Sequence, residues 1–321
     1  MRLWLPSASS VAPEVDRLLL GLLLLSCLVL VAVFGLMWIF IWRYRHNSGI
    51  DRGQISERTW RIESAWTAAT LFVFFGLFIW GAHLFVRLQQ PPPDALKVYA
   101  VGKQWMWKIE HVGGQREINT LHVPVNKTIE VVLTSEDVIH DFFIPGFRIK
   151  HDVLPDRYDA VWFKATKPGT YHLFCSQFCG SLHASMVGEV VVMQGPDYQR
   201  WLEQNGASGS LVAQGQQLFM RFGCSGCHGG NGAGGAQSGS LVRAPRLAGL
   251  YGSPVTLTDG RVVLADDRYI RDCIMLPDTL RVASYPPVMP SFAGQMSEED
   301  LLKIIAYIKS LAPETPSENP S

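Results

Sequence analysis

The apolar residues of this chain gather in two long runs near its N-terminus. Residues 18–42 carry no charged side chain, and residues 65–86 contain a single histidine, His83. At ~1.5 Å per residue, each run is long enough as a helix to cross a hydrocarbon layer of ~30 Å. The alternative, a helix buried in a soluble core, rarely stays uncharged over such a length. We therefore predict transmembrane helices at residues 18–42 and 62–88, in contact with membrane lipid.

The segment between the two runs predicts how the helices are oriented. Its charged side chains are Arg43, Arg45, Asp51, Arg52, Glu57, Arg58 and Arg61. Short basic loops stay cytoplasmic, so residues 43–61 are expected inside. Residues 1–17 and both later domains are then expected on the periplasmic side of a bacterial inner membrane. Cys27 follows a triplet that resembles a lipoprotein cleavage site, but the run stays apolar beyond it, which favours an ordinary helix residue.

Short β-branched segments follow the second apolar run. Consecutive prolines at residues 91–93 end the helix, because proline cannot continue one. The strand-like segments are residues 128–134, 158–163, 170–174 and 187–193. Such strands, punctuated by turns, predict a β-sandwich or barrel over residues 94–194.

The last third of the chain has a helical pattern. We predict a linker over residues 195–210, with a short helical stretch at 198–203, and an all-α domain over 211–312. The final helix has Ser297 as its N-cap, with Asp300 closing a capping box. Its apolar face consists of Leu301, Ile304, Ile305, Ile308 and Leu311. A glycine-rich insert at 229–240 is too poor in apolar residues to pack, and residues 313–321 form a predicted disordered tail.

One segment of the predicted β domain concentrates the ligands that copper selects, which are thiolate, imidazole and thioether. They are Cys175, Cys179, His183 and Met186. Two cysteines four positions apart in a tight loop can point both sulfurs inward, so that each thiolate bridges two copper ions. His183 would bind one copper, and Met186 would make a weak axial contact.

A second imidazole must come from a distant part of the β domain. His140 lies at the end of a strand-like segment and qualifies, while the backbone carbonyl of Gln177 completes the set. The alternative is a disulfide between Cys175 and Cys179, which leaves His183 and the following methionine without a role.

The sequence Cys224-Ser-Gly-Cys227-His228 matches the attachment signal for a c-type haem. The two cysteines would form thioethers, and His228 would be the proximal ligand of the haem iron. A zinc site would need a second pair of ligands. Met289, in a proline-rich turn before the last helix, is the best candidate for the sixth ligand. Two weaker rivals for the sixth ligand are Met275 and Met296.

The copper motif, together with the two helices, resembles subunit II of cytochrome c oxidase over the chain up to residue 193. The added haem motif resembles the caa(3)-type oxidases, in which a cytochrome c domain is fused to that subunit. The resemblance implies a multidomain membrane protein with a two-helix transmembrane hairpin, a cupredoxin-like domain and a class I cytochrome c domain. It also implies cofactors, namely a covalently attached haem c and a binuclear copper A centre with two copper ions.

The resemblance further implies a place in respiration. The chain would be the electron-input subunit of an oxidase that also contains a haem-copper subunit I and a subunit III. The electron donor would be cytochrome c or a cytochrome c-reducing complex. Oxygen reduction and proton pumping would occur in subunit I, because this chain has no candidate for the six-histidine oxygen site.

Four further residues take expected roles from the resemblance. Trp105 would accept electrons near the copper, although core packing explains it equally well. Glu63 would lie at the mouth of a proton channel, or simply favour a helix start. The carbonyl of Pro245 would accept the proton of His228, unless Pro245 only forms a turn. Gln177 replaces a glutamate that helps to hold a magnesium ion, which leaves that magnesium site in doubt.

Two other functions use the same motifs. A copper-containing nitric oxide reductase subunit would relay electrons in the same way, and a copper delivery or assembly protein would bind one labile Cu(I). Quinol oxidases are excluded, because their related subunit lacks these copper ligands. The net charge of zero gives no indication of a nucleic-acid partner, and none is expected. Cys273 receives no role.

Overall fold

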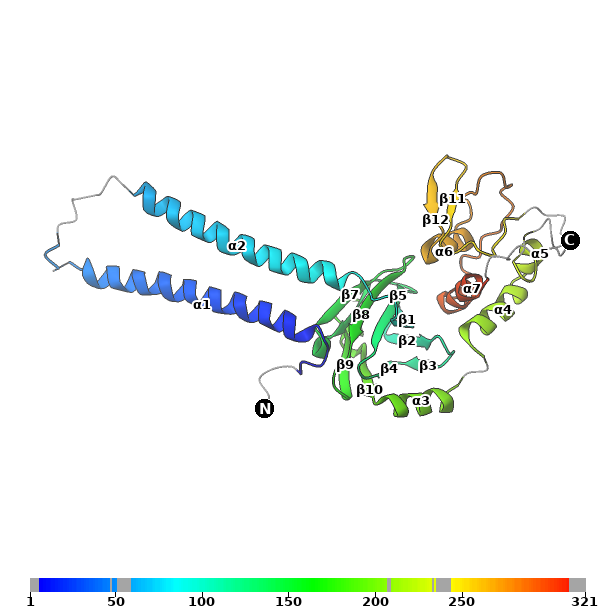
Figure 1. The fold of residues 1–321 in the computed structure, drawn as a ribbon, viewed down its shortest axis with the longest axis horizontal. Coiled ribbons are helices and arrows are strands. Elements are labelled where there is room, and N and C mark those ends of the chain that lie inside the picture. The colour runs from blue at the N-terminus through cyan, green and yellow to red at the C-terminus, as the bar shows by residue number, and fades with distance from the viewer. Residues whose placement is uncertain are drawn as a thin grey trace, which may run out of the picture.

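The computed structural model describes residues 6–46, 48–50, 59–206, 209–232, 234 and 244–311. Figure 1 shows three parts in a row, namely a pair of long helices, a β domain and a smaller, mostly helical C-terminal domain. The predicted multidomain architecture is confirmed. Three predicted features lie largely outside the described residues: the central part of the basic loop with Arg52 and Arg58, most of the glycine-rich insert, and the tail.

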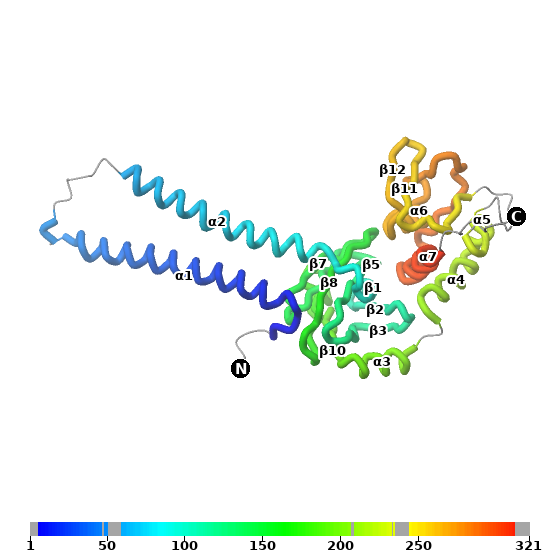
Figure 2. Tube along the Cα trace, viewed as in Figure 1, coloured from blue at the N-terminus to red at the C-terminus, as the bar shows by residue number. Residues whose placement is uncertain are grey.

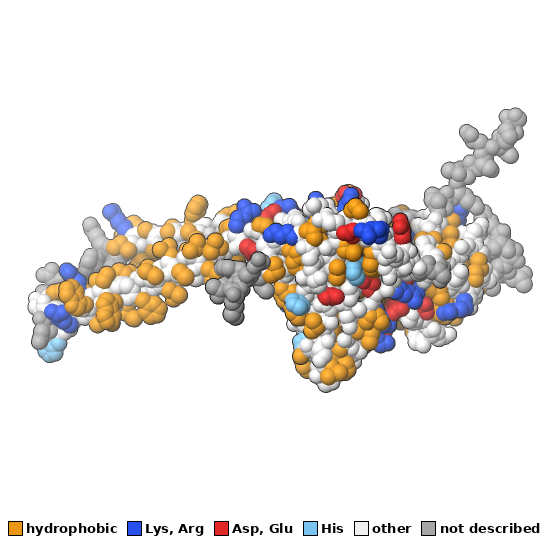
Figure 3. Space-filling view, turned by 90° about the horizontal axis from the view of Figure 1, so that it is seen from below, with side chains coloured by type: hydrophobic (Ala, Val, Ile, Leu, Met, Phe, Trp, Pro, Cys, Tyr) orange, Lys and Arg blue, Asp and Glu red, His pale blue; other side chains and the backbone are white. Residues whose placement is uncertain are grey.

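The long helices are α1 (Ala12–Arg43) and α2 (Trp60–Leu88), both long and apolar enough to cross a membrane. Each begins before the predicted residue, because a polar first turn can precede the apolar run. Hydrophobic side chains coat the pair in Figure 3. Near the β domain, Arg87 Nη1 lies 2.9 Å from Glu14 Oε2, which joins the end of α2 to the start of α1.

The β domain contains two five-stranded sheets. The first has the strand order β3 (Arg116–Ile118), β2 (Met106–His111), β1 (Leu96–Lys103), β5 (Thr128–Ser135) and β8 (Asp159–Lys164). The second has the order β4 (Thr120–Pro124), β10 (Val187–Met193), β9 (Gly169–Cys175), β6 (His140–Ile144) and β7 (Ile149–Val153). Two short 3-10 helices are η1 (Pro145–Phe147) and η2 (His183–Ser185). The four predicted strand segments correspond to β5, β8, β9 and β10.

The core of the β domain forms because inward side chains alternate along the strands of both sheets. Its largest fully buried side chains include Trp107, Phe142 and Phe163. The residues before α1 belong to this domain as well. Ala8, whose side chain is fully buried, accepts a backbone hydrogen bond from Thr166 and donates one to Gly146. The start of the described chain is therefore attached to the β domain, as Figure 2 also shows.

The predicted linker is largely replaced by helix α3 (Gly195–Gln204), which packs against the β domain. The ring of Trp201 stacks on His122 with 4.6 Å between centroids, and Tyr198 Oη lies 3.3 Å from His111 Nδ1. The short helical stretch predicted at 198–203 is thus longer and fixed. The chain passes from the β domain to the C-terminal domain between the end of α3 and the start of α4.

The C-terminal domain contains α4 (Leu211–Arg221), α5 (Ser225–His228), α6 (Asp267–Met275) and α7 (Glu298–Ser310). Ser297 caps α7 as predicted, because its side chain accepts a hydrogen bond from the amide of Asp300. Ile304 and Ile308 on the predicted apolar face are buried. A small hairpin, β11 (Pro254–Thr256) and β12 (Val262–Leu264), was not anticipated, because three-residue strands leave too short an alternation to detect.

Helices α4 and α7 cross at Gly215. A Cβ atom at this position would meet the backbone oxygen of Lys303 at 1.9 Å. We expect Gly215→Ala to lower the free energy of unfolding of the C-terminal domain by about 1–3 kcal/mol, the usual cost of overpacking. Thermal unfolding of the purified protein measures this. Gly195→Ala is the control, since nothing lies within 4 Å of its Cβ position. Equal stability of both variants would contradict the close crossing.

Candidate metal and haem centres

The pairing of β6 with β9 brings the distant histidine to the cysteine loop. Phe142 lies opposite Cys175 in this antiparallel register, so His140, two residues earlier, extends beyond the end of β9. The chain after β9 then turns through the loop that contains Cys179 and His183. Because side chains alternate along a strand, a register shift of one residue would point His140 away from the loop.

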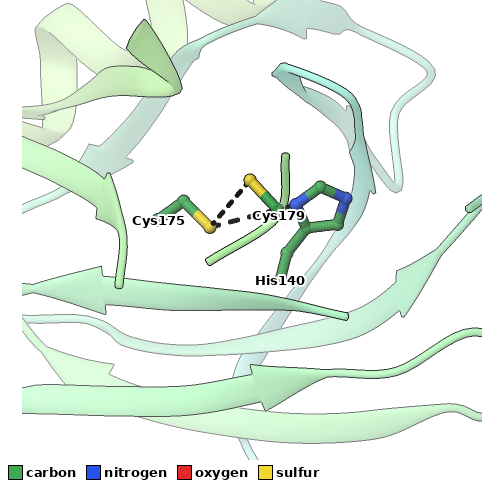
Figure 4. Close-up of side chains that lie close together, drawn as sticks. All are labelled: His140, Cys175 and Cys179. Carbon is green, nitrogen blue, oxygen red and sulfur yellow. Dashed lines mark hydrogen bonds between the residues drawn. The ribbon is translucent and has the colours of Figure 1, made fainter. Parts of the chain in front are cut away.

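The predicted ligands converge in one cluster. The nearest ligand atoms of His140, Cys175 and Cys179 all lie within 4.8 Å of one another, and all three residues are buried. In Figure 4, dashed lines join the sulfur of Cys175 to the sulfur of Cys179 and to the ring of His140. These two distances are 3.8 Å and 3.9 Å.

The remaining predicted ligands complete the cluster. His183 Nδ1 lies 3.4 Å from Cys179 Sγ, and Met186 Sδ lies 3.9 Å from the same sulfur. The backbone oxygen of Gln177 lies 3.2 Å from Cys175 Sγ. Two thiols, two imidazole nitrogens, a thioether and a carbonyl therefore face one buried point. This donor set fits copper, whose ligands are soft sulfur and borderline nitrogen.

The thiols themselves favour a bound cation. Burial raises the pKa of the Cys175 thiol, but its hydrogen bonds with His140 and with the backbone outweigh burial and lower the pKa to about 7. For Cys179, burial and the neighbouring Cys175 sulfur together raise the pKa to about 12. The surrounding protein therefore stabilises one negative charge on the pair, and the second thiolate needs a metal ion beside it.

Asp137 orients His140. His140 was predicted from the sequence as a ligand, but this role of Asp137 was not identified. Its Oδ1 lies 2.8 Å from His140 Nε2. A carboxylate accepts, so Nε2 must donate, and Nδ1 is left free on the side of the sulfurs. The signal was present in the sequence, since Asp137 stands three residues before a predicted ligand. The backbone amide of Gln104 also donates to Asp137, at 2.7 Å.

Trp105 lies against the same loop. Its indole Nε1 donates to the backbone oxygen of Cys179 at 3.3 Å, and the neighbouring Gln104 Nε2 donates to the same oxygen at 2.8 Å. The ring is only partly buried and packs on the core of the β domain. This position is compatible with both core packing and electron entry, because the ring packs on the core but is only partly buried.

The haem motif lies beside an apolar pocket in the C-terminal domain. Cys224 and His228 line this pocket together with Ile270, Ile308 and Met289. The space between these residues is about 1020 Å³, including open solvent at its mouth. The apolar lining, with a histidine and a thioether, fits a haem group.

The imidazole of His228 is held in a single orientation. Its Nδ1 lies 2.9 Å from the backbone oxygen of Pro245, and since a carbonyl only accepts, Nδ1 carries the proton. The other nitrogen, Nε2, is then free to bind a metal. Burial lowers the pKa of His228, against the opposing effect of the Pro245 hydrogen bond, so the ring is neutral as a ligand must be.

Among the three candidate axial methionines, Met289 lines the apolar pocket and the other two do not. Met275 and Met296 are buried in the core of the domain instead. Cys273 also lines the pocket, but burial raises the pKa of its thiol to about 11, so it remains a neutral apolar wall residue. Glu63 lies far from both centres, in the first turn of α2 at the end of the helix pair away from the β domain.

Comparison with known protein families gives two matches along the chain. Residues 115–194 match the family described as cytochrome c oxidase subunit II, periplasmic domain. Residues 212–312 match the cytochrome c family. The first matched region contains the candidate copper ligands, and the second contains the haem motif. The part of the β domain before residue 115 lies outside the first match.

Individual relatives agree with these matches. The chain is 27% identical over 316 residues to cytochrome c oxidase subunit 2 of Alkalihalophilus pseudofirmus, covering 92% of this chain and 86% of the relative. It is 33% identical over 177 residues to haem-copper oxidase subunit 2 of Aeropyrum pernix, covering 49% and 75%, respectively. Among solved structures, the periplasmic domain of subunit II of cytochrome oxidase from Bradyrhizobium japonicum is 34% identical, covering 36% of this chain and 96% of that domain, with a TM-score of 0.35.

The copper cluster predicts a specific effect at Asp137. We expect Asp137→Asn to lower the copper affinity about 10- to 100-fold, because the amide no longer fixes the His140 tautomer as the carboxylate does. Copper retention during dialysis against a chelator measures this. Asp152→Asn, on the neighbouring strand β7, is the matched control and should retain copper. Equal copper retention by the two variants would remove Asp137 from the site.

The haem pocket predicts the sixth ligand. We expect Met289→Leu to keep the proposed haem, since Cys224 and Cys227 would hold it covalently, but to lower the reduction potential within the ~0.8 V span that axial ligands control. Redox titration followed by visible absorption measures this. Met296→Leu is the control. A lowered potential in the control variant, with Met289→Leu unchanged, would transfer the ligand role to Met296.

Proposed function

This chain belongs to the cytochrome c oxidase subunit II family, and we propose that it is the electron-input subunit of a respiratory oxidase with its own haem c and copper A centre. The complex is an oxidoreductase, as its relatives are. The observation that carries the proposal is the convergence of two cysteines and two histidines in one buried cluster, in a chain that also contains a haem pocket. We expect electrons to come from cytochrome c or a cytochrome c-reducing complex.

The proposal assigns a role to each group of residues. When bound, the copper pair and the haem c each accept and release single electrons. Cys175, Cys179, His140 and His183 would hold the copper ions. Asp137 keeps the first imidazole in the required tautomer, at 2.8 Å. Cys224, Cys227, His228 and Met289 would attach and ligate the haem, with Pro245 fixing the proximal ring.

A closed surrounding supports single-electron chemistry at the copper cluster. His140 is fully buried, and Cys179 and Met186 are at most 3% exposed. The loop is held to β6 by a hydrogen bond of 2.7 Å from Ser176 Oγ to Asp141 Oδ1. His183, at the edge of the cluster, is half-buried. The buried ligands, fixed by such contacts, reorganise little when their charge changes, which favours rapid transfer. We propose that Trp105, through its contact with the Cys179 carbonyl, lies on the path by which electrons reach the copper.

The membrane orientation is part of the proposal. Both α1 and α2 meet the β domain at the same end of the pair, and the residues before α1 are bonded to that domain. Arg43, Arg45 and Arg61 lie at the opposite end. Basic segments remain cytoplasmic, so the β domain, the C-terminal domain and the N-terminus would be periplasmic in a bacterial inner membrane.

The remaining partners lie in or near the membrane. Exposed apolar side chains along both helices would contact lipid and subunit I, with subunit III in the same complex. Glu63 would face the cytoplasmic side, where it can serve a proton channel that leads into subunit I. Oxygen reduction and proton pumping would belong to subunit I. A magnesium ion at the subunit interface would have to bind without a carboxylate at Gln177.

Turnover of the purified complex tests the proposal. We expect oxygen consumption with reduced cytochrome c, and we expect Cys175→Ala/Cys179→Ala to reduce it to background while the haem is still reduced by the donor. Cys27→Ser, which replaces a cysteine of α1 outside both proposed sites, is the control and should retain activity.

Three results would contradict the proposal. Consumption of nitric oxide instead of oxygen would indicate a nitric oxide reductase. A single labile Cu(I) per chain would indicate a copper delivery protein. Full oxygen consumption by the Cys175→Ala/Cys179→Ala variant would show that the cluster is not on the electron path.

A further inference from the structure

The connection between β7 and β8, residues 154–158, contacts the C-terminal domain at a buried arginine. Arg271 on α6 is only 1% exposed, and its Nη2 lies 2.6 Å from Asp156 Oδ1. The same nitrogen lies 2.7 Å from Glu298 Oε1, at the start of α7. Tyr158 Oη donates to Glu298 Oε2 at 3.2 Å. Each member of the Arg271–Glu298 pair therefore binds one residue of the β domain.

The two domains contribute differently to this contact, since the C-terminal domain supplies an ion pair and the β domain supplies two hydrogen-bonding side chains. Arg271 and Glu298 form a buried ion pair inside the C-terminal domain, and such a pair is costly to break because it leaves an unpaired buried charge. Asp156 and Tyr158 come from the other domain and contribute one hydrogen bond each. The side chain of Asp156 is 80% exposed, so it lies at the rim of the contact. Removing these two groups leaves the internal pair intact.

The other side of the same connection reaches the copper cluster. The backbone oxygen of Leu154 accepts from the amide of Ser135 at 3.2 Å. The hydroxyl of Ser135 then donates to the backbone oxygen of Val138 at 2.6 Å and accepts from the amide of Asp137 at 3.2 Å. Asp137 in turn orients His140. The connection thus lies two hydrogen bonds from Asp137, the residue that orients His140.

On the far side of the contact, α6 is a wall of the haem pocket. Ile270 and Ile274, which flank Arg271 on this helix, line the pocket. The other contacts between the domains lie on different elements. Lys303 Nζ on α7 lies 3.6 Å from Glu110 Oε1 on β2, and both side chains are buried. Tyr99 and Val101 of β1 form an apolar cluster with Leu211 and Leu302. The pair of Lys108 and Glu299 is about a quarter exposed on each side and contributes little. Residues 154–158 thus join the haem-pocket helix to the copper-ligand loop.

We propose that Asp156 and Tyr158 are positioning residues that seat the C-terminal domain on the β domain and so fix the separation of the haem and copper sites. This inference rests on the proposed function. The step that depends on it transfers one electron, which oxidises the ferrous haem iron and reduces the copper pair, and no proton moves. Arg271 acts as the fixed receptor for the β domain because Glu298 already holds it in place.

The double variant Asp156→Asn/Tyr158→Phe, in the complete complex with both cofactors loaded, tests this inference. Loss of the two hydrogen bonds should make the opened arrangement about tenfold more populated. We expect transfer from haem to copper, followed by absorption after rapid reduction of the haem, to slow by a similar factor. Hydrogen exchange of the α6 and early α7 amides should accelerate about tenfold, while the haem and copper spectra remain unchanged.

Two further variants control for a purely structural effect. Asp159→Asn changes a neighbouring carboxylate that pairs with Arg157 and His151, at 3.2 Å and 3.6 Å, within the β domain. It should transfer electrons at the wild-type rate. The single variant Asp156→Asn should slow transfer from haem to copper. Asp156→Glu keeps the charge at this exposed position and should retain most of the wild-type transfer rate.

The outcomes separate this inference from the proposed function. An unchanged rate of transfer in the double variant overturns the inference, as does an equal slowing in Asp159→Asn. A wild-type complex that lacks copper or haem signals overturns the proposed function instead.

Discussion

The pairing of β6 with β9 is the constraint on which the proposed copper site depends. Five of the six proposed ligands lie within residues 175–186, but His140 is separated from Cys175 by strands β7 and β8 and by three connections. The register that places Phe142 opposite Cys175 brings the two together. Since Phe142 is fully buried in the core, any slip would expose its ring and remove a ligand at once. Packing of the sandwich and assembly of the metal site are therefore the same event.

The haem site depends on packing in a different way. Its attachment residues are adjacent in sequence and need no long-range pairing. The fold instead supplies the pocket, through the crossing of α4 with α7 and the wall formed by α6. Gly215 permits this crossing, because the backbone of Lys303 occupies the place of a side chain. The haem motif is evident from the sequence alone, but its pocket forms only when α6 and α7 pack beside it.

Local signals explain which parts were predictable. The two long helices, the last helix, strands β5, β8, β9 and β10, the Ser297 cap and the two closely spaced ligand motifs are encoded by residues close together in the chain, where composition and spacing are sufficient. The two-stranded hairpin and the full length of α3 depend on tertiary contacts, as in the stacking of Trp201 on His122. Gly102 is a similar case, since a Cβ there would meet the ring of His140 at 2.8 Å. No local pattern distinguishes such a glycine from one in a turn.

Contacts between the domains were the least predictable, because each residue resembles an ordinary surface charge in its own domain. Asp156 pairs with Arg271 across the two domains, and Glu110, which also pairs with Arg116 in its own domain, gains Lys303 as a second partner. A flexible tether alone would hold the domains at an effective concentration in the millimolar range, without fixing their orientation. Electron transfer over a gap requires a fixed approach as well as proximity. A fused haem domain therefore gains from specific docking contacts, and the buried Arg271–Glu298 pair provides a rigid receptor for them.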